Sequence, residues 1–139
     1  MIILDSDVVS ALMRLRPEQA VVHWLDQQAP SSIWITSITV MEIRYGLQTM
    51  PKGLRQETMT KSFEQLLDSK VERRIAPFDS EAAQQAADLM SLRKIKGRPG
   101  DVKDTMIAGI ALATRATLAT RNTSHFEDLS VPVVDPWKI

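Results

Sequence analysis

The first nine residues, MIILDSDVV (residues 1–9), decide the fold class of this chain. Ile2–Leu4 is a short apolar run that ends at the acid Asp5, a pattern that indicates a buried strand. Directly after it, Ser6 or Asp7 is a suitable N-cap for a helix. A buried strand that leads straight into a helix is typical of α/β proteins with a parallel sheet.

Strands and helices alternate along the rest of the chain. Further strands are expected at Ile33–Ile35, Arg74–Phe78, Thr117–Thr120 and Val131–Val134. Helices are expected over Pro17–Gln28, Ser37–Gln48, Gly53–Ser69 and Asp79–Lys94, and from Asp101 onward, with Ser37 and either Asp79 or Ser80 as N-caps. No repeat or linker-like stretch interrupts this pattern. We therefore predict a single domain, residues 1–139, with a central parallel sheet of about four to five strands and helices on both faces.

The composition excludes several functional classes. The 139 residues carry 17 Lys and Arg against 17 Asp and Glu, which argues against nucleic-acid binding by bulk positive charge. The absence of cysteine excludes disulfides, thiolate nucleophiles and cysteine-based zinc sites, and two histidines cannot form a zinc triad. The longest apolar run, Met106–Ala113, is too short to cross a bilayer, and no basic region opens the chain as in a signal peptide. We expect a cytoplasmic protein without membrane contact.

Acidic and amide side chains fall at one edge of the expected sheet. Open α/β sheets bind ligands beyond the carboxyl ends of their strands, where helices begin. Four distant stretches of sequence deliver polar residues to that edge: Asp5, Asp7, Glu42, Asp101, Asp104 and Asn122. A cluster of oxygen ligands without cysteine suits Mg²⁺ or Mn²⁺, which activate water for attack on phosphate esters. The pattern therefore favours metal-assisted phosphodiester hydrolysis.

Glu42 lies at an unusual position for an acid. On a helical period it shares a face with Ile38, Met41 and Tyr45, and so it interrupts an apolar stripe. A carboxylate on a core-facing stripe costs free energy unless it is paired, protonated or bound to a cation. The simpler interpretations are an ion pair with a neighbouring arginine such as Arg44 and a position at the edge of the stripe.

The other polar residues also have local interpretations. Asp5 can simply end a strand, and Asp7 can cap the helix that follows. Asp101 and Asp104 lie in a first helical turn, where negative charge is stabilising by roughly 0.3–1 kcal/mol each, although Asp104 also leads an apolar stripe. Asn122 suits a turn. The convergence of these residues, rather than any one of them, indicates a site.

Four motifs in this order resemble the PIN-domain ribonucleases: LDSDVVSAL (4–12), TSITVMEIRYG (36–46), GDVKDTMIAGIALA (100–113) and TLATRNTSHF (117–126). Within that superfamily the chain is similar to the VapC toxins, and its ending Val134-Asp135-Pro136-Trp137 resembles the FitB-like branch. The resemblance covers essentially the whole chain. It implies a PIN-domain fold and a Mg²⁺- or Mn²⁺-dependent endoribonuclease, the toxin of a bacterial type II toxin–antitoxin system. It also implies an RNA substrate, a cognate antitoxin, a homodimer, and a higher assembly on DNA through the antitoxin.

The resemblance also assigns roles to individual residues. Catalytic and metal-binding roles fall on Asp5, Glu42 and Asp104. Accessory roles fall on Asp7, Asp101 and Asn122, and on the hydroxyls of Ser6, Thr105 and Thr120. The fourth acidic position of many PIN domains is Asn122 here, which has an oxygen ligand but no negative charge. Asp7 stands where toxins of this kind often carry Asn, so it restores part of that charge.

An acidic site repels RNA, so basic residues around it must hold the substrate. The arginines nearest the acidic motifs are Arg14, Arg44, Arg98 and Arg121. Four cations of the segment Arg93–Arg98 also precede Asp101, although cations equally favour a helix C-terminus. Arg44 can instead pair with a carboxylate, and His125 either touches substrate or lies on the surface. We expect the balanced charges to be segregated, with acids at one pocket and cations around its rim.

Two other functions stay open from the sequence. Asp5-Ser6-Asp7 followed by Gly100-Asp101 and Asp104 resembles the haloacid-dehalogenase-type phosphatases, in which Asp5 would be the nucleophile. That resemblance leaves Glu42 unexplained. The other possibility is a non-catalytic PIN-like module that binds RNA or a partner, with Asn122 marking a decayed site.

Overall fold

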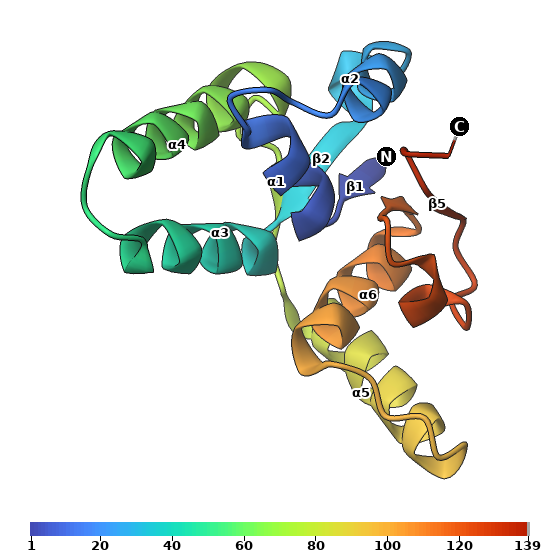
Figure 1. The fold of residues 1–139 in the computed structure, drawn as a ribbon. Helices are drawn as coiled ribbons and strands as arrows, with labels where there is room; N and C mark the ends of the chain where they lie inside the picture. The colour runs from blue at the N-terminus through green and yellow to red at the C-terminus, as the bar shows by residue number, and fades with distance from the viewer. Residues whose placement is uncertain (139) are drawn as a thin grey trace.

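The computed structural model describes residues 1–138, whose five strands form one parallel sheet (Figure 1). The strands are β1 (Ile2–Leu4), β2 (Ile33–Thr36), β3 (Ile75–Ala76), β4 (Thr117–Ala119) and β5 (Val133–Val134). Their order in the sheet is β3-β2-β1-β4-β5, and each neighbouring pair is parallel. The expected parallel α/β sheet is confirmed, and β1 lies at its centre.

Six α-helices connect the strands in the described part of the chain. They are α1 (Ser6–Met13), α2 (Gln19–Asp26), α3 (Ser37–Thr49), α4 (Leu54–Gln65), α5 (Ser80–Ile95) and α6 (Val102–Thr114). Shorter helical turns are η1 (Pro30–Ser32), η2 (Leu66–Lys70), which continues α4, and η3 (Thr123–Phe126). No helix within residues 1–138 is long and apolar enough to cross a membrane.

Two hydrophobic cores, one on each face of the sheet, hold these helices in place. Adjacent residues of β1 point to opposite faces, because side chains alternate along a strand. Leu4 packs in the core formed with α1, α2, α3 and α4, whereas Ile3 packs in the core formed with α5 and α6. In β4, Ala119 and Leu118 are divided between the two cores in the same way. A strand that is buried on both faces reads as a continuous apolar run, which explains the first residues of the chain.

Two helix caps differ from those expected. The N-cap of α1 is Asp5, whose carboxylate accepts a hydrogen bond from the Ser6 amide, rather than Ser6 or Asp7. The N-cap of α3 is Thr36, whose hydroxyl accepts from the Thr39 amide, rather than Ser37. Both caps are at strand ends, because strand and helix follow one another without a loop. The last extended residue then has the backbone conformation that an N-cap needs.

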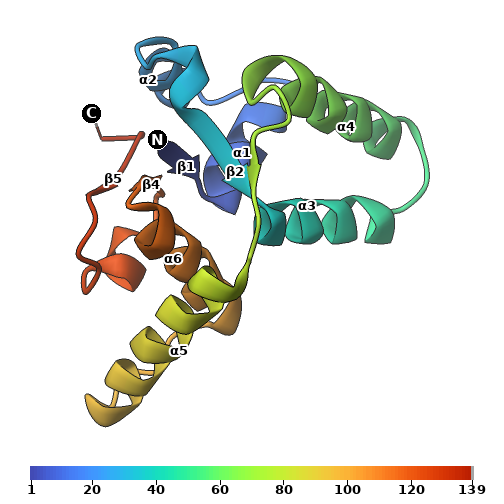
Figure 2. The same ribbon diagram turned by 180° about the vertical axis from the view of Figure 1, so that it is seen from behind.

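The apolar stripe expected on α3 is not a core face. Ile38 is buried, but Met41 and Tyr45 are 52% and 70% exposed. The other buried residues of α3 are Thr39, Ile43 and Leu47. Figures 1 and 2 show α3 and α4 extending from the sheet on the same side, so that much of α3 has no protein opposite it. The expectation that Glu42 interrupts a core stripe is therefore wrong.

Gly109 allows α5 and α6 to approach closely. A methyl group at this position would lie 2.5 Å from the carbonyl oxygen of Ala82 and 2.9 Å from the Cβ of Ala86. We expect Gly109→Ala to lower the free energy of unfolding by about 1–3 kcal/mol, because the two helices must move apart. Urea denaturation measures this effect.

Gly46→Ala in α3 is the matched control. A methyl group there would have no neighbour within 4 Å. This substitution should leave the stability unchanged or raise it by about 0.4–1 kcal/mol, because alanine has less freedom in the unfolded chain. Equal losses for both variants would contradict the close α5–α6 packing.

Candidate active site

The register of β1 against β4 brings two distant residues together. Leu4 pairs with Ala119, and the Asp5 amide donates to the Ala119 carbonyl oxygen at 2.9 Å. Asp5 and Thr120 therefore leave the sheet side by side. The helices α1, α3 and α6 begin at or near this edge of the sheet, as Figure 1 shows. The site expected at the strand ends thus has a physical basis in the sheet topology.

Asp5 is a buried carboxylate that is held at both oxygens. It is 5% exposed, and it accepts from the Ser6 amide at 2.8 Å and from the Thr120 hydroxyl at 2.7 Å. Burial, followed by the negative charge of Asp7, raises its pKa from the usual 3.8 to about 7, and Asp104 adds a smaller contribution in the same direction. Three carboxylates from α1, its N-cap and α6 therefore share one electrostatic environment.

Asp7 contributes a carboxylate oxygen without a partner. Its Oδ2 accepts from the Arg121 amide at 3.0 Å and faces the Thr120 hydroxyl at 3.4 Å. Its Oδ1 is buried and has no hydrogen-bond partner among residues 1–138. Burial raises the pKa of Asp7, and the charge of Asp104 contributes in the same direction. A buried oxygen without a donor is costly by itself and is well suited to a cation.

Glu42 is linked to the site through Ser6. The Ser6 hydroxyl donates to Glu42 Oε1 at 2.9 Å and also lies 3.2 Å from the Thr39 hydroxyl. The second oxygen of Glu42 lies 3.7 Å from the ammonium group of Lys103. The ion pair expected between Glu42 and Arg44 is absent among the described residues, because Arg44 instead pairs with a glutamate of α4.

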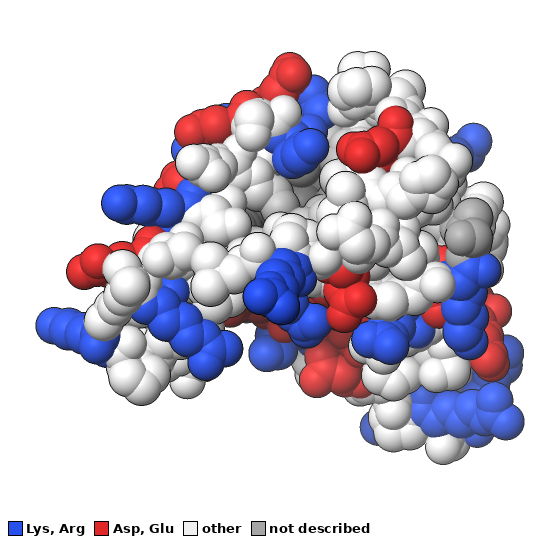
Figure 3. Space-filling view, turned by 45° about the horizontal axis from the view of Figure 1, so that its top comes forward, with Lys and Arg blue, Asp and Glu red and all other residues white. Residues whose placement is uncertain are grey.

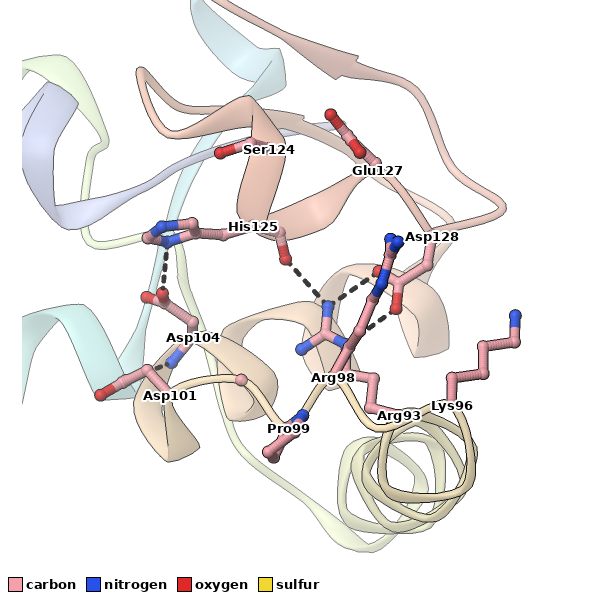
Figure 4. A pocket seen from close by; sticks show the side chains of 11 residues that line it. Arg93, Lys96, Arg98, Pro99, Asp101, Asp104, Ser124, His125, Glu127 and Asp128 are labelled. Carbon is pink, nitrogen blue, oxygen red and sulfur yellow. Dashed lines mark hydrogen bonds and ion pairs between the residues drawn. The ribbon is translucent and has the colours of Figure 1, made fainter.

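At the start of α6, Asp101 caps the helix and Asp104 contacts a residue of another element. Asp101 is the N-cap and accepts from the Asp104 amide at 3.0 Å, which confirms its simpler interpretation. The Oδ2 of Asp104 lies 3.0 Å from Nδ1 of His125 (Figure 4). The Thr105 hydroxyl is turned inward, where it donates to the Asp101 carbonyl oxygen. His125 is exposed, as its interpretation as a surface residue expects, and it also contacts Asp104.

The turn after β4 is held by backbone contacts. The Asn122 amide donates to the Thr120 hydroxyl at 3.1 Å, and the residue itself is exposed. The guanidinium group of Arg121 lies over the ring of Trp137, 4.9 Å from its centroid. Asn122 thus has the turn role that its sequence indicates, while its amide supports Thr120 beneath the acids.

The expected substrate-binding arginines differ in their surroundings. Arg14 pairs with Glu18 at 3.2 Å, and Arg44 pairs with Glu64 at 2.9 Å and lies over the Phe63 ring. Arg98 instead lines a cleft of about 410 Å³ beside Asp104 and His125 (Figure 4). Of these side chains, Arg98 is therefore the one with an open cleft next to the acids.

Arg93 does not belong to the basic surface expected over residues 93–98. It is 5% exposed, and its guanidinium group forms two hydrogen bonds of 2.8 Å to the carboxylate of Asp128. The buried residues of α5 are Ala82, Ala86, Leu89 and Arg93, which recur at helical spacing. An arginine that continues an apolar stripe was the signal in the sequence that could have revealed its burial.

Charge is unevenly distributed over the surface despite the zero net charge. Figure 3 shows acidic side chains gathered near the lower middle of one face, with Lys and Arg on both sides of them. Further acidic side chains lie at the edges of the same face, so the expected segregation of acids from cations is only partial in this view.

The donors at the sheet edge fit a hard divalent cation by their chemistry. They are carboxylate oxygens, one of them buried and unpartnered at Asp7. Within residues 1–138, no three His, Asp or Glu side chains converge tightly enough to enclose a metal as they lie. Asp104 is bonded to His125, and Glu42 to Ser6. Binding of an ion would therefore draw the remaining oxygens of these carboxylates closer together.

The PIN-domain family model matches residues 2–131. This chain belongs to the PIN-domain family. It is 36% identical over 138 residues to "VapC ribonuclease Y4jK" of Sinorhizobium fredii, and 34% identical over 137 residues to "Toxin FitB" of Neisseria gonorrhoeae, each alignment covering 99% of both chains. The crystal structure of FitAcB from Neisseria gonorrhoeae superimposes with a TM-score of 0.90 at 33% identity and covers 100% of both chains. The PIN fold and the likeness to VapC and FitB toxins are thus confirmed.

Membership of the PIN family does not support the phosphatase alternative. That alternative rests on the acidic motifs at residues 5–7 and 100–104, both of which lie within the stretch that the PIN-domain model matches. It also leaves Glu42 without a role, although Glu42 contacts Ser6 between Asp5 and Asp7.

The metal-free protein should lose stability as the pH rises from about 4 to about 7. In the folded state the pKa of Asp5 is about 7 instead of its usual 3.8, so folding takes up a proton between these pH values. Above the folded pKa this advantage is gone. We expect the free energy of unfolding in EDTA to fall by up to about 1.4 kcal/mol per pH unit from this group. Urea denaturation at a series of pH values measures the slope.

Asp5→Asn should flatten this decline, because the asparagine side chain does not titrate. Asp79→Asn is the control, since Asp79 caps α5 in the same way but lies outside the acidic cluster. A wild-type slope in Asp5→Asn would show that burial of Asp5 is not the cause.

Proposed function

We propose that this PIN-domain protein is a Mg²⁺- or Mn²⁺-dependent endoribonuclease and the toxin of a bacterial type II toxin–antitoxin system. The observation that carries the proposal is that Asp5, Asp7 and Asp104 lie close enough beyond the carboxyl ends of the strands to affect one another's charge. One buried oxygen of Asp7 also has no hydrogen-bond partner among the described residues. Its relatives include one that is named as a ribonuclease and one that is named as a toxin. The donor set and the family point to the same chemistry.

The residues that would hold the ion are the carboxylates of Asp5, Asp7, Glu42 and Asp104. A divalent ion bound there supplies an activated water and offsets the charge that develops on a phosphodiester. The protein itself holds these carboxylates in fixed orientations. Asp5 is fixed by the Ser6 amide and the Thr120 hydroxyl, and Ser6 in turn positions Glu42. These hydrogen bonds orient the carboxylates, which must still move closer together to enclose an ion.

Cations beside the acids would hold the RNA backbone. Lys96 and Arg98 line the cleft that also contains Asp104, so a phosphate bound by them lies close to the acids. The glutamate partners of Arg14 and Arg44 compete with phosphate for these two side chains. We therefore assign the main phosphate contact to Arg98, with Arg121 beside Asp7 as a further candidate.

The proposed partner is a cognate antitoxin. Similarity to the VapC and FitB toxins supports this partner, and a homodimer and an assembly on DNA through the antitoxin stay predictions. Leu15, between α1 and α2, and Leu54, at the start of α4, are each 79% exposed and offer apolar contacts for a protein partner.

The purified protein should cleave single-stranded RNA in Mg²⁺ or Mn²⁺ and lose this activity in EDTA. Asp5→Asn and Asp104→Asn should each lower the cleavage rate by more than about 100-fold, the upper end of what losing even an outer partner of a metal ligand costs. Gel-based cleavage of a labelled RNA measures the rate.

Asp79→Asn provides the control, because it removes an N-cap carboxylate of α5 away from the proposed site. Its rate should equal that of the wild type. Cleavage that persists in both site variants would point to a contaminating nuclease. If the folded wild-type protein binds RNA but cleaves none in either metal, the non-catalytic alternative is correct.

A further inference from the structure

The buried guanidinium group of Arg93 connects three elements of the fold. Arg93 lies near the end of α5, and its Nε and Nη2 bind the two oxygens of Asp128 at 2.8 Å each. Nη2 also donates to the His125 carbonyl oxygen at 2.9 Å, and Nη1 donates to the Thr105 hydroxyl at 3.1 Å. One side chain thus ties α5 to the first turn of α6 through Thr105 and to η3 through the His125 carbonyl oxygen, and Figure 4 shows the second of these bonds.

Two of these contacts are adjacent to the acidic site. Thr105 follows Asp104 in the chain, and His125 is the residue whose Nδ1 lies 3.0 Å from Asp104 Oδ2. Asp104 and His125 come from different elements, α6 and η3, and Arg93 bonds to both elements, through the Thr105 hydroxyl and the His125 carbonyl oxygen. The Arg93 contacts therefore fix the distance across which the Asp104–His125 hydrogen bond forms.

The surroundings of Arg93 are built to fit a guanidinium group. A methyl group at Gly100 would lie 2.9 Å from Nη1 of Arg93, so the loop before α6 passes directly over the side chain. Asp128 raises the pKa of Arg93, and Arg93 lowers the pKa of Asp128, so the two groups stay ionised together. A buried ion pair is often no more stabilising than apolar residues of the same size. Stability alone therefore does not account for the Arg93–Asp128 pair, and we ask what its hydrogen bonds hold in place.

We infer that Arg93, together with Asp128, is a positioning residue of the active site. It holds η3 against the first turn of α6 and thereby sets the His125 ring on one oxygen of Asp104, which leaves the other oxygen for the cation. The catalytic consequence rests on the proposed ribonuclease function, whereas the positioning of His125 does not. Outer hydrogen bonds of this kind orient metal-binding carboxylates.

The His125 ring gives a direct readout in the metal-free protein. A carboxylate only accepts hydrogen bonds, so His125 should carry its proton on Nδ1 when it is bonded to Asp104. The chain has two histidines, and His23 on α2 serves as the internal reference. Long-range ¹H–¹⁵N NMR spectra at one fixed pH should show the Nδ1-protonated form of His125 in the wild type. Arg93→Lys and Asp128→Asn should both shift this signal toward the mixture of forms of a free ring.

The kinetic readout separates positioning from general stability. In Arg93→Lys and Asp128→Asn, kcat for RNA cleavage should fall by about 10- to 100-fold with little change in KM, because misplacement of a reactive group mainly affects the chemical step. The control is Arg74→Lys. Arg74 is also largely buried, with 17% of its side chain exposed, and it donates to the carbonyl oxygens of Ile33 and Pro30. Its replacement should lower the melting temperature but leave the His125 signal and kcat unchanged.

The outcomes are distinguishable. Unchanged His125 signals in both folded variants would overturn the inference, as would equal losses of kcat in Arg93→Lys and Arg74→Lys. If Arg93→Lys does not fold, Asp128→Asn alone decides, because it retains the shape of the side chain and removes the charge. If the wild-type protein cleaves no RNA, the proposed function fails, yet the NMR comparison still tests whether Arg93 positions His125.

Discussion

Parallel pairing of β1 with β4 is the constraint on which the candidate site depends. It joins residues more than a hundred positions apart, so that the Thr120 hydroxyl reaches Asp5 at 2.7 Å. The same pairing directs Asp7 toward the Arg121 amide. β1 has neighbours on both sides and is buried on both faces. A shift by one residue would therefore move Leu4 and Ile3 to the opposite faces of the sheet, each into the wrong core. The pairing that sets the register of the sheet therefore also sets the positions of these acids.

Burying the negative charges of the acids at this edge costs free energy, and the hydrogen bonds of the fold do not fully offset it. Burial raises the pKa of both Asp5 and Asp7; the charge of Asp7 adds to the shift of Asp5, and the charge of Asp104 adds to both shifts. The hydrogen bonds from Ser6, Thr120 and the Arg121 amide oppose this shift but do not cancel it. A site of this kind is stabilised either by protons or by a cation, so its stability and its proposed chemistry depend on the same charges.

The fold, and the nearness of the residues of the candidate site, were predictable because both follow from local patterns. Short apolar runs such as Ile2–Leu4 indicate strands, and the strand-end rule then places Asp5, Asp7, Glu42 and Asp104 near one another without any knowledge of distances. What joins them was not predictable. The Ser6 hydroxyl that contacts Glu42 depends on the angle between α1 and α3, and no periodicity in either helix encodes that angle.

The wrong expectations about α3 and about Arg93 share a cause. Helical spacing tells which residues lie on one face, but it does not tell what lies opposite that face. Met41 and Tyr45 form an apolar face on α3 that has no core opposite it, whereas the cation Arg93 lies on a face that does. Arg93 also has a partner, Asp128, in a segment more than thirty residues away, and pairs at that separation are set by tertiary packing.

The position of Arg93 also bears on how the acids tolerate one another. The charge of Asp104 is one of the causes that raise the pKa of Arg93, so the buried guanidinium is electrostatically linked to the acidic cluster as well as bonded to its neighbours. Two of its contacts, to Thr105 and to the His125 carbonyl oxygen, are neutral, so Asp128 neutralises the cation directly and Asp104 does so only through space. A buried positive charge favours negative charge nearby, so Arg93 lowers the electrostatic cost of placing the acid Asp104 in this cluster. The arrangement allows Asp104 to remain available at the site while Arg93 is held too firmly to bind it directly.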